Sequence, residues 1–198
     1  MRLFVAIKLS NTPEFEKILK YLQRNLSEDQ MKWVNPDNLH LTLKFFGNIP
    51  KSKIPSINKV LSNIASKTQP FQLQLSGIGQ FGSQYNPKIL WMNIKNPEPV
   101  KSLGETILNE LNKEGFLRDR QNFVPHFTLA RIKKIKSKAF YHKVIDQVRD
   151  EELNPIIVKN FTLFESKLTP NGPIYRPIRG FPLSVGNKEK PGSPLISQ

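Results

Sequence analysis

The sequence predicts an α+β fold with antiparallel sheets, arranged as two similar lobes. Strand-like and helical segments alternate too irregularly along the 198 residues for a parallel sheet built from βαβ units. The motif His-x-Thr-Leu occurs twice, at residues 40–43 and 126–129, each time on a segment with strand patterning. A chain of this length can bury one large core or form two small lobes that share a core.

The first half of the chain begins with a strand pattern over residues 2–8. Thr12 and Pro13 then predict the cap and first turn of a helix, whose apolar residues recur at helical spacing over 13–26. The remaining expected elements of this half are a short strand at 31–34, a turn at 35–38, a strand at 39–46 ending at Gly47, and a helix at about 51–66.

The second half continues with strands at 70–76 and 88–95, joined by a loop that contains Gly77, Gly79 and Gly82. The other expected elements are a helix at 98–114 with Gly115 near its end, a strand at about 126–132, a helix near 137–150, and strands near 156–166 and 174–184. We predict a single two-lobed domain over residues 1–185. Residues 186–198 are rich in Lys, Gly, Pro and Ser and are expected to form a flexible tail.

The composition limits the classes of function. Thirty Lys and Arg residues against sixteen Asp and Glu give a formal charge of +14, which favours polyanionic partners such as RNA, although a solvated lysine-rich surface is the alternative. The absence of cysteine excludes disulfides and thiolate sites. No apolar run approaches the ~18 residues that span a membrane, and the N-terminus lacks a secretory pattern. We therefore expect a soluble, cytoplasmic protein.

Strand alternation sorts each motif into two faces. In the first motif, the polar face is expected to carry His40, Thr42 and Lys44, and the apolar face Leu39, Leu41, Leu43 and Phe45. In the second motif, His126 and Thr128 lie opposite Phe127 and Leu129. Two residues on one strand face are only ~7 Å apart, so each His and Thr pair can contact a single phosphate.

Two imidazoles can catalyse displacement at phosphorus without a metal. A neutral imidazole accepts a proton from water while a protonated one gives a proton to the leaving oxygen, and a pKa near 6.5 allows both forms at neutral pH. The threonine hydroxyls can bind the non-bridging oxygens. A half-exposed strand is the simpler interpretation of one copy, and a metal site is another alternative. Neither motif contains a carboxylate, and the third histidine, His142, lies in a predicted surface helix. We expect no metal and no cofactor.

The residues from Asn38 to Gly47 and from Pro125 to Arg131 resemble the two signatures of the two-histidine phosphoesterase superfamily. Within it they are most similar to the RNA 2′,3′-cyclic phosphodiesterases, also called the 2′-5′ RNA ligase or LigT-like family. Weaker similarities extend over nearly the whole chain. They comprise Phe4-Val5-Ala6-Ile7, Trp33-Val34, Leu90-Trp91, Leu163-Phe164-Glu165-Ser166 and Gly172-Pro173-Ile174-Tyr175.

The resemblance implies two pseudo-symmetric lobes that flank a central basic cleft, and metal-free hydrolysis of RNA 2′,3′-cyclic phosphate ends to 2′-phosphomonoesters. It also implies that His40 is the proton donor, that His126 is the proton acceptor, and that Thr42, Thr128 and Arg131 bind the phosphate. Strict alternation places Arg131 opposite His126, so a bulge or the strand's end would have to turn it inward. Lys44 is our own addition, as an RNA contact on the catalytic face. Phe46 departs from the leucine common at that position of the family.

Other interpretations stay open at the level of sequence. The glycines at 77–82 predict a hairpin rather than a nucleotide-binding loop. Trp33, Phe81 and Trp91 are candidates for base stacking or for the core, and the basic run at 133–138 for RNA steering or for a solvated helix start. The alternatives to a hydrolase are a non-catalytic module that binds RNA ends, and reversible 2′-5′ ligation. We predict a monomer without an obligate protein partner.

Overall fold

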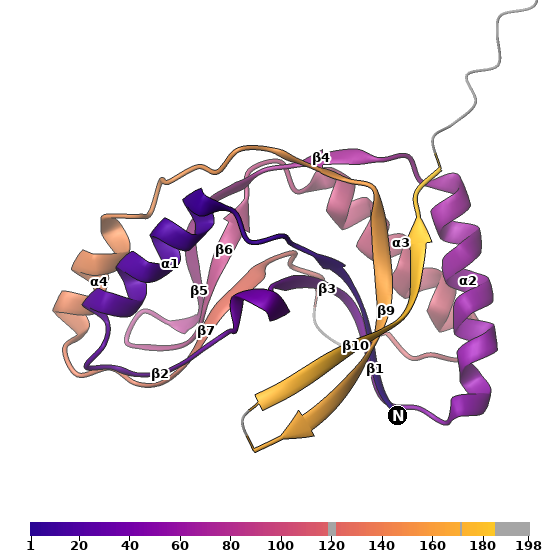
Figure 1. Ribbon diagram of the computed structural model, residues 1–198, viewed down its shortest axis with the longest axis horizontal. Helices are drawn as coiled ribbons and strands as arrows, with labels where there is room; N and C mark the ends of the chain where they lie inside the picture. Colours follow the sequence, from indigo (N-terminus) through magenta and orange to yellow (C-terminus); the bar gives the residue numbers. More distant parts are fainter. Residues whose placement is uncertain (119–121, 171, 185–198) are drawn as a thin grey trace, which may run out of the picture.

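The computed structural model describes residues 1–118, 122–170 and 172–184, and it consists mainly of two antiparallel four-stranded sheets. The sheets follow one another along an arched molecule, with helices toward its two ends (Figure 1). One sheet has the strand order β10-β9-β1-β3 and the other β2-β7-β6-β5. The predicted α+β class with antiparallel sheets is therefore confirmed.

The first sheet contains the first motif in its edge strand. Its members are β1 (Arg2–Lys8), β3 (His40–Asn48), β9 (Asn160–Thr169) and β10 (Gly172–Pro182). Helices α2 (Ile54–Lys67) and α3 (Glu98–Lys113) pack against each other, with α2 also against β10 and α3 against β3. The motif strand is thus held by a strand on one side and by a helix behind it.

The second sheet contains the second motif in an interior strand. Its members are β2 (Gln30–Trp33), β5 (Leu75–Ser83), β6 (Asn86–Ile94) and β7 (Phe127–Lys134). Helices α1 (Pro13–Asn25) and α4 (Lys138–Asp146) lie together at this end of the molecule (Figure 1). The remaining elements are two short paired strands and two single turns of 3₁₀ helix: β4 (Phe71–Leu73), β8 (Ile156–Val158), η1 (Pro36–Asn38) and η2 (Lys51–Lys53).

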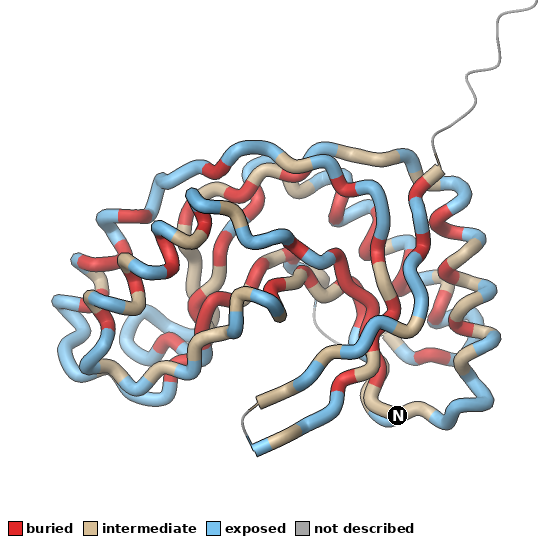
Figure 2. Tube along the Cα trace, in the orientation of Figure 1, coloured by how far each residue is buried: buried red, intermediate tan, exposed pale blue. Residues whose placement is uncertain are grey.

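The chain crosses between the two sheets, so that they share one core. Helix α1 follows β1 of the first sheet but packs with α4, and α3 follows β6 of the second sheet but packs against β3. One continuous cluster of buried apolar residues runs through both sheets, which Figure 2 shows as buried positions along the strands and inner helix faces. The motif strands β3 and β7 also contact each other directly. This contact brings the two motifs to the middle of the molecule.

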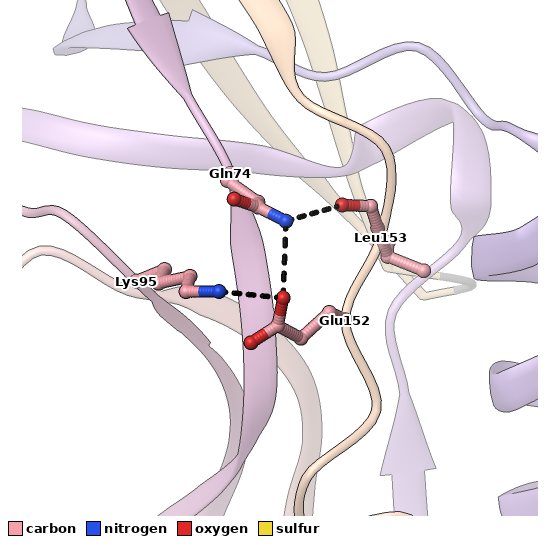
Figure 3. Close-up of polar contacts among 4 residues, drawn as sticks. All are labelled: Gln74, Lys95, Glu152 and Leu153. Carbon is pink, nitrogen blue, oxygen red and sulfur yellow. Dashed lines mark hydrogen bonds and ion pairs between the residues drawn. The ribbon is translucent and has the colours of Figure 1, made fainter.

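A polar cluster at the end of the second sheet anchors the crossing from α4 to β8 (Figure 3). The Gln74 amide donates hydrogen bonds to Glu152 Oε2, at 3.3 Å, and to the Leu153 carbonyl, at 3.2 Å. Lys95 Nζ lies 2.7 Å from the same Glu152 oxygen. The backbone of Leu153 also donates to the Leu75 carbonyl. The ion pair is half exposed and contributes little alone, so the backbone pairing carries most of this anchor.

One predicted loop is a strand instead. Gly77, Gly79 and Gly82 lie inside β5, which continues to Ser83 and pairs with β6. Gly79 is required because a Cβ there would meet the Trp91 ring of β6, and Gly77 has a positive φ of 73°. Gly79 and Gly82 are thus explained by close packing on β6, and β5 and β6 form the hairpin that the glycines predict. The predicted tail at 186–198 lies outside the described residues, and within the described ranges no helix is long and apolar enough to cross a membrane.

Candidate active site

Each motif strand bulges at the same position, one residue after the threonine. Along β3 the pairing with β1 passes from Ala6–Thr42 to Val5–Lys44 and skips Leu43. Along β7 the pairing with β6 passes from Trp91–Thr128 to Leu90–Ala130 and skips Leu129. A bulge adds one residue and so exchanges the faces of the side chains that follow it, up to any further bulge. The alternation that the sequence suggests therefore fails at the fifth residue of both motifs.

The bulge in β3 overturns the expected position of Lys44. Lys44 pairs with Val5, a member of the main core, and its side chain is buried with Nζ donating to the Leu117 carbonyl at 2.7 Å. The expectation that Lys44 lies on the catalytic face beside His40 was wrong. Phe45, expected in the core, lies instead on the His40 side, where its ring stacks on Phe4 at 6.3 Å. We therefore no longer place Lys44 in contact with RNA.

The matching bulge in β7 brings Arg131 to the face of His126. Arg131 pairs with Ile89 and Thr128 with Trp91, so two residues of β6 separate them in register and both side chains share one side. Arg131 is exposed and close enough to His126 for its charge to affect the imidazole. The bulge that the sequence required for Arg131 is present. We call the side of β3 and β7 that carries His40, Thr42, Phe45, His126, Thr128 and Arg131 the motif face.

Both histidines make the same hydrogen bond to the backbone two residues earlier. His40 Nδ1 lies 2.6 Å from the Asn38 carbonyl, and His126 Nδ1 lies 2.7 Å from the Val124 carbonyl. A carbonyl oxygen only accepts, so Nδ1 must carry the proton in both rings. In the neutral imidazole this leaves Nε2 as the basic nitrogen. Each motif therefore presents Nε2 for proton transfer, as an acceptor when neutral and as a donor when charged.

Long-range contacts fix the carbonyls that orient the two rings. The Asn38 side chain donates to the Pro173 carbonyl of β10 at 3.1 Å, which ties the segment before His40 to the first sheet. The segment before His126 is held by Phe123, whose ring lies over Gly104 of α3 where a Cβ would overlap it. The buried Lys44 holds the same connection through Leu117. Lys44 thus links the first motif strand to the chain that leads into the second.

The surroundings of both imidazoles favour their neutral forms. Burial is the largest cause that lowers the pKa of His40, and the charge of His126 lowers this pKa further. Burial also lowers the pKa of His126, and the Arg131 guanidinium adds to this effect. In both rings the hydrogen bond to the backbone carbonyl opposes the shift by stabilising the charged form. The charge of His126 acts on His40, so the two imidazoles lie within electrostatic range of each other.

Aromatic rings pack against each histidine. Around His40 they are Phe4, at 5.1 Å between centroids, and Tyr175, at 5.1 Å and nearly edge-on. Around His126 they are Phe81, at 4.8 Å, and Trp91, at 5.9 Å. Phe81 and Trp91 also stack on each other at 5.1 Å, and the buried Trp91 Nε1–H has no acceptor among the described residues. These rings restrict the orientation of the imidazoles and contribute to their burial.

The sequence reasoning missed one residue at this site and left others open. Tyr175 of β10 touches the His40 ring, and its hydroxyl is close enough to both Arg131 and Arg2 to sense their charges. Tyr175 lies in β10, and its place near His40 can be inferred only once the strand order of the first sheet is known. Trp33 is partly buried against the core, and Lys136 of the basic run pairs with Glu28 at 2.5 Å. Among residues 1–118, 122–170 and 172–184, no three His, Cys, Asp or Glu side chains gather as metal ligands.

Known proteins share this sequence and fold. The family described as LigT like Phosphoesterase matches residues 7–91 and 94–175. The RNA 2′,3′-cyclic phosphodiesterase of Archaeoglobus fulgidus is 32% identical over 181 residues, which are 91% of this chain and 99% of that protein. Its counterpart in Methanocaldococcus jannaschii is 33% identical over 179 residues, 90% of this chain and 99% of that one.

Solved structures agree in fold. TT0787 of Thermus thermophilus superposes with a TM-score of 0.73 at 26% identity, over 92% of this chain and 98% of that one. The apo form of E. coli LigT superposes with a TM-score of 0.73 at 24% identity, over 92% and 97% of the two chains. The shared architecture extends over nearly the whole described chain.

Proposed function

Because the chain belongs to the LigT-like phosphoesterase family, we propose that it hydrolyses RNA 2′,3′-cyclic phosphate ends to 2′-phosphomonoesters by acid–base catalysis between His40 and His126. The predicted family and the predicted enzyme class, a phosphoesterase, are confirmed by the family match and by relatives with the diesterase name. One observation carries the mechanism. In both imidazoles Nδ1 is bound to a backbone carbonyl, which leaves Nε2 for proton transfer, and the charge of His126 acts on His40.

The reaction needs one proton removed and one supplied. His126 Nε2 takes a proton from water, whose oxygen forms the new bond to phosphorus while the bond from phosphorus to O3′ breaks. His40 Nε2 gives its proton to O3′, which leaves as the 3′-hydroxyl and keeps the phosphate on O2′. Arg131 supports a base at His126, because a cation beside it disfavours the charged imidazole. Burial and the charge of His126 also lower the pKa of His40, so the acid role needs the substrate to offset them. Substrate binding brings a negative phosphodiester to His40 and favours its protonated form.

Charge on the phosphoryl oxygens is matched by groups of the motif face. Thr42 and Thr128 each lie two residues beyond a histidine on the same strand side and can donate to the non-bridging oxygens. Arg131 supplies a full positive charge there without an ion-pair partner among the described residues. These donors provide the electrostatic stabilisation that a metal ion provides in other phosphoesterases. The mechanism therefore requires no cofactor.

A product assay tests this function. Metal-stripped protein in excess chelator is incubated with an oligoribonucleotide that ends in a 2′,3′-cyclic phosphate, and the position of the product phosphate is mapped. Conversion to a 2′-phosphate, abolished in His40→Ala and His126→Ala, is expected. His142→Ala is the matched control, because His142 lies on α4 with Nε2 at 3.1 Å from the Gln84 carbonyl, away from both motifs. Binding of the RNA by folded protein without conversion would favour a non-catalytic module that holds RNA ends.

A further inference from the structure

Arg2 is an arginine of β1, on the side of the first sheet that continues the motif face of β3, and the mechanism does not use it. Along β1, Leu3, Val5 and Ile7 belong to the main core, whereas Phe4 and Ala6 form a separate cluster on the other side. Phe4 pairs with Phe45 and touches the His40 ring at 5.1 Å. Arg2 is two residues before Phe4, so its side chain leaves β1 on this same side.

The Arg2 guanidinium is held in place but is incompletely bonded. Its Cζ lies 5.0 Å from the centroid of the Phe45 ring, an arrangement that favours a cation over an aromatic face. Its Nε is buried and has no hydrogen-bond acceptor among the described residues. No carboxylate of that part of the chain pairs with it. A fixed guanidinium without a carboxylate partner keeps its charge for an anion from outside the described residues.

Arg2 and Arg131 together place positive charge at two points of the motif face. The hydroxyl of Tyr175 senses both guanidinium groups, so both lie within electrostatic range of one residue that also touches His40. The two motifs differ at the residue that the bulge turns onto this face, which is Arg131 on β7 and Phe45 on β3. Phe45 does not carry a charge but positions the Arg2 charge from the neighbouring strand.

The Arg2 guanidinium lies against the Phe45 ring, beyond the Phe4 ring that packs on His40, rather than beside the imidazole. Arg2 pairs with Asn48 and Lys8 with His40, so six residues of β1, roughly 20 Å of extended strand, separate their backbones. The rings of Phe4 and Phe45 lie between the guanidinium and the imidazole. RNA carries a phosphate at every nucleotide, so a cation beyond the reacting end faces a phosphate further along the strand.

This inference rests on the proposed function. We propose that Arg2, held by Phe45, binds a backbone phosphate on the 5′ side of the terminal nucleotide. The enzyme then acts more efficiently on oligoribonucleotide ends than on nucleoside 2′,3′-cyclic phosphates, because a nucleoside cyclic phosphate has no phosphate for Arg2. The contact is a substrate contact and takes no part in proton transfer.

The test compares Arg2→Gln with the parent protein on two substrates, cytidine 2′,3′-cyclic phosphate and a tetraribonucleotide with the same end. For the tetraribonucleotide we expect kcat/KM to fall about tenfold, mainly through KM. The slope of log kcat/KM against log salt concentration should become shallower by about 0.7, the value for one lost single-strand phosphate contact. For the nucleoside cyclic phosphate we expect a change of less than about twofold. Phe45→Leu should also lower kcat/KM for the tetraribonucleotide more than for the nucleoside cyclic phosphate, but by a smaller factor than Arg2→Gln.

Two controls separate the outcomes. Arg24→Gln removes the same charge from the exposed last turn of α1 and should leave both substrates and the salt slope unchanged. An equal loss on both substrates in Arg2→Gln, or no loss on the tetraribonucleotide, would overturn the proposal. If the parent protein hydrolyses neither substrate, the proposed function fails. The Arg2–phosphate contact is then tested by measuring the affinity for a fluorescent tetraribonucleotide. Arg2→Gln must weaken this binding and make the dependence of log affinity on log salt concentration shallower by the same amount.

Discussion

The two His-x-Thr strands share their geometry but differ in their surroundings. Both bulge after the threonine, and both histidines donate Nδ1–H to the carbonyl two residues earlier. Yet β3 is an edge strand backed by α3, whereas β7 lies inside its sheet between β2 and β6. The residue that the bulge turns onto the motif face is Phe45 in one motif and Arg131 in the other.

This difference shows how a symmetric motif can serve an asymmetric reaction. In both motifs a backbone carbonyl binds Nδ1 and leaves Nε2 as the basic nitrogen, and the threonine lies on the same strand side as the histidine. The residue beyond the bulge then decides the charge beside each imidazole. Arg131 disfavours a proton on His126, while the first motif carries the neutral ring of Phe45 on this face. This difference supports the proposed base at His126, whereas the proposed acid at His40 depends on the negative substrate, because burial and the charge of His126 lower the pKa of His40.

Removing either imidazole should give the largest effect. We expect His40→Ala and His126→Ala each to lower kcat on a cyclic phosphate end by a factor of about 10³ or more, a barrier increase of about 4 kcal/mol. The double variant should be little worse than either single variant, because the two groups act in one step. Steady-state kinetics measures this. Additive losses would indicate two independent contributions and would contradict the concerted pair.

Removing a threonine hydroxyl should give the next largest effect. Thr42→Val and Thr128→Val keep the shape of the side chain and delete one donor to the phosphoryl oxygens, so kcat should fall about 10²-fold in each. Near-equal losses would support the same role in both lobes. Normal kcat in one of the two variants would show that the lobes bind the phosphate unequally. Thermal unfolding of the same samples checks that both variants remain folded.

Replacing Arg131 should act on one histidine only. In Arg131→Gln the cation that disfavours the His126 imidazolium is lost, so the pKa of His126 rises while that of His40 changes less. We expect activity near neutral pH to fall roughly tenfold, because the base is protonated more often and a phosphate contact is missing. NMR titration of the imidazole protons measures both rings. A larger rise at His40 than at His126 would contradict the placement of Arg131.

A substitution on α3 should disturb the orientation of His126 without touching the imidazole. Gly104→Ala adds a Cβ where the Phe123 ring lies, which should shift the Val124 carbonyl that orients His126. Alanine is favoured over glycine in a helix by about 1 kcal/mol, so a loss of stability would report the clash. We expect kcat to fall several-fold. Gly180→Ala is the control, since its Cβ would meet only Thr162 Oγ1, at 3.9 Å. Equal kinetics in the two variants would show that Phe123 does not position the site.

The smallest expected effect is a shift of the pH optimum, which depends on both histidines together. Burial holds the pKa of both histidines below their ordinary value of 6.5, so the bell of kcat/KM, which reports the free enzyme, should be centred below pH 6.5. A bound phosphodiester is negative and favours the charged imidazoles, so the bell of kcat should lie at higher pH. Rates across the acidic to mildly basic range, measured in buffers of constant ionic strength, test both. Profiles centred above neutrality for kcat/KM would contradict the buried environment.

Local patterning predicted most of the helices and strands, because each depends on residues close in the sequence. The repeated motif placed the two histidines and two threonines together. The predicted face of Lys44 was wrong. Alternation along one strand cannot reveal the bulge at Leu43, because that bulge is defined only by the pairing of β3 with β1. The same kind of bulge was required in advance for Arg131, because the family resemblance makes Arg131 a phosphate ligand while strict alternation places it opposite His126. Tyr175 was part of a family similarity, but its place beside His40, and that of Arg2, could not be predicted because both depend on the order of β10, β9, β1 and β3.

The division of labour between the two histidines is tested most directly with a better leaving group. The substrate is a cyclic phosphate whose 3′-oxygen is replaced by sulfur, because a thiolate leaves without needing a proton. We predict that this substrate restores most of the rate to His40→Ala, which lacks the acid, and leaves His126→Ala inactive, since water still needs a base. Restoration in His126→Ala instead would reverse the assigned roles, and restoration in neither would contradict acid catalysis by His40.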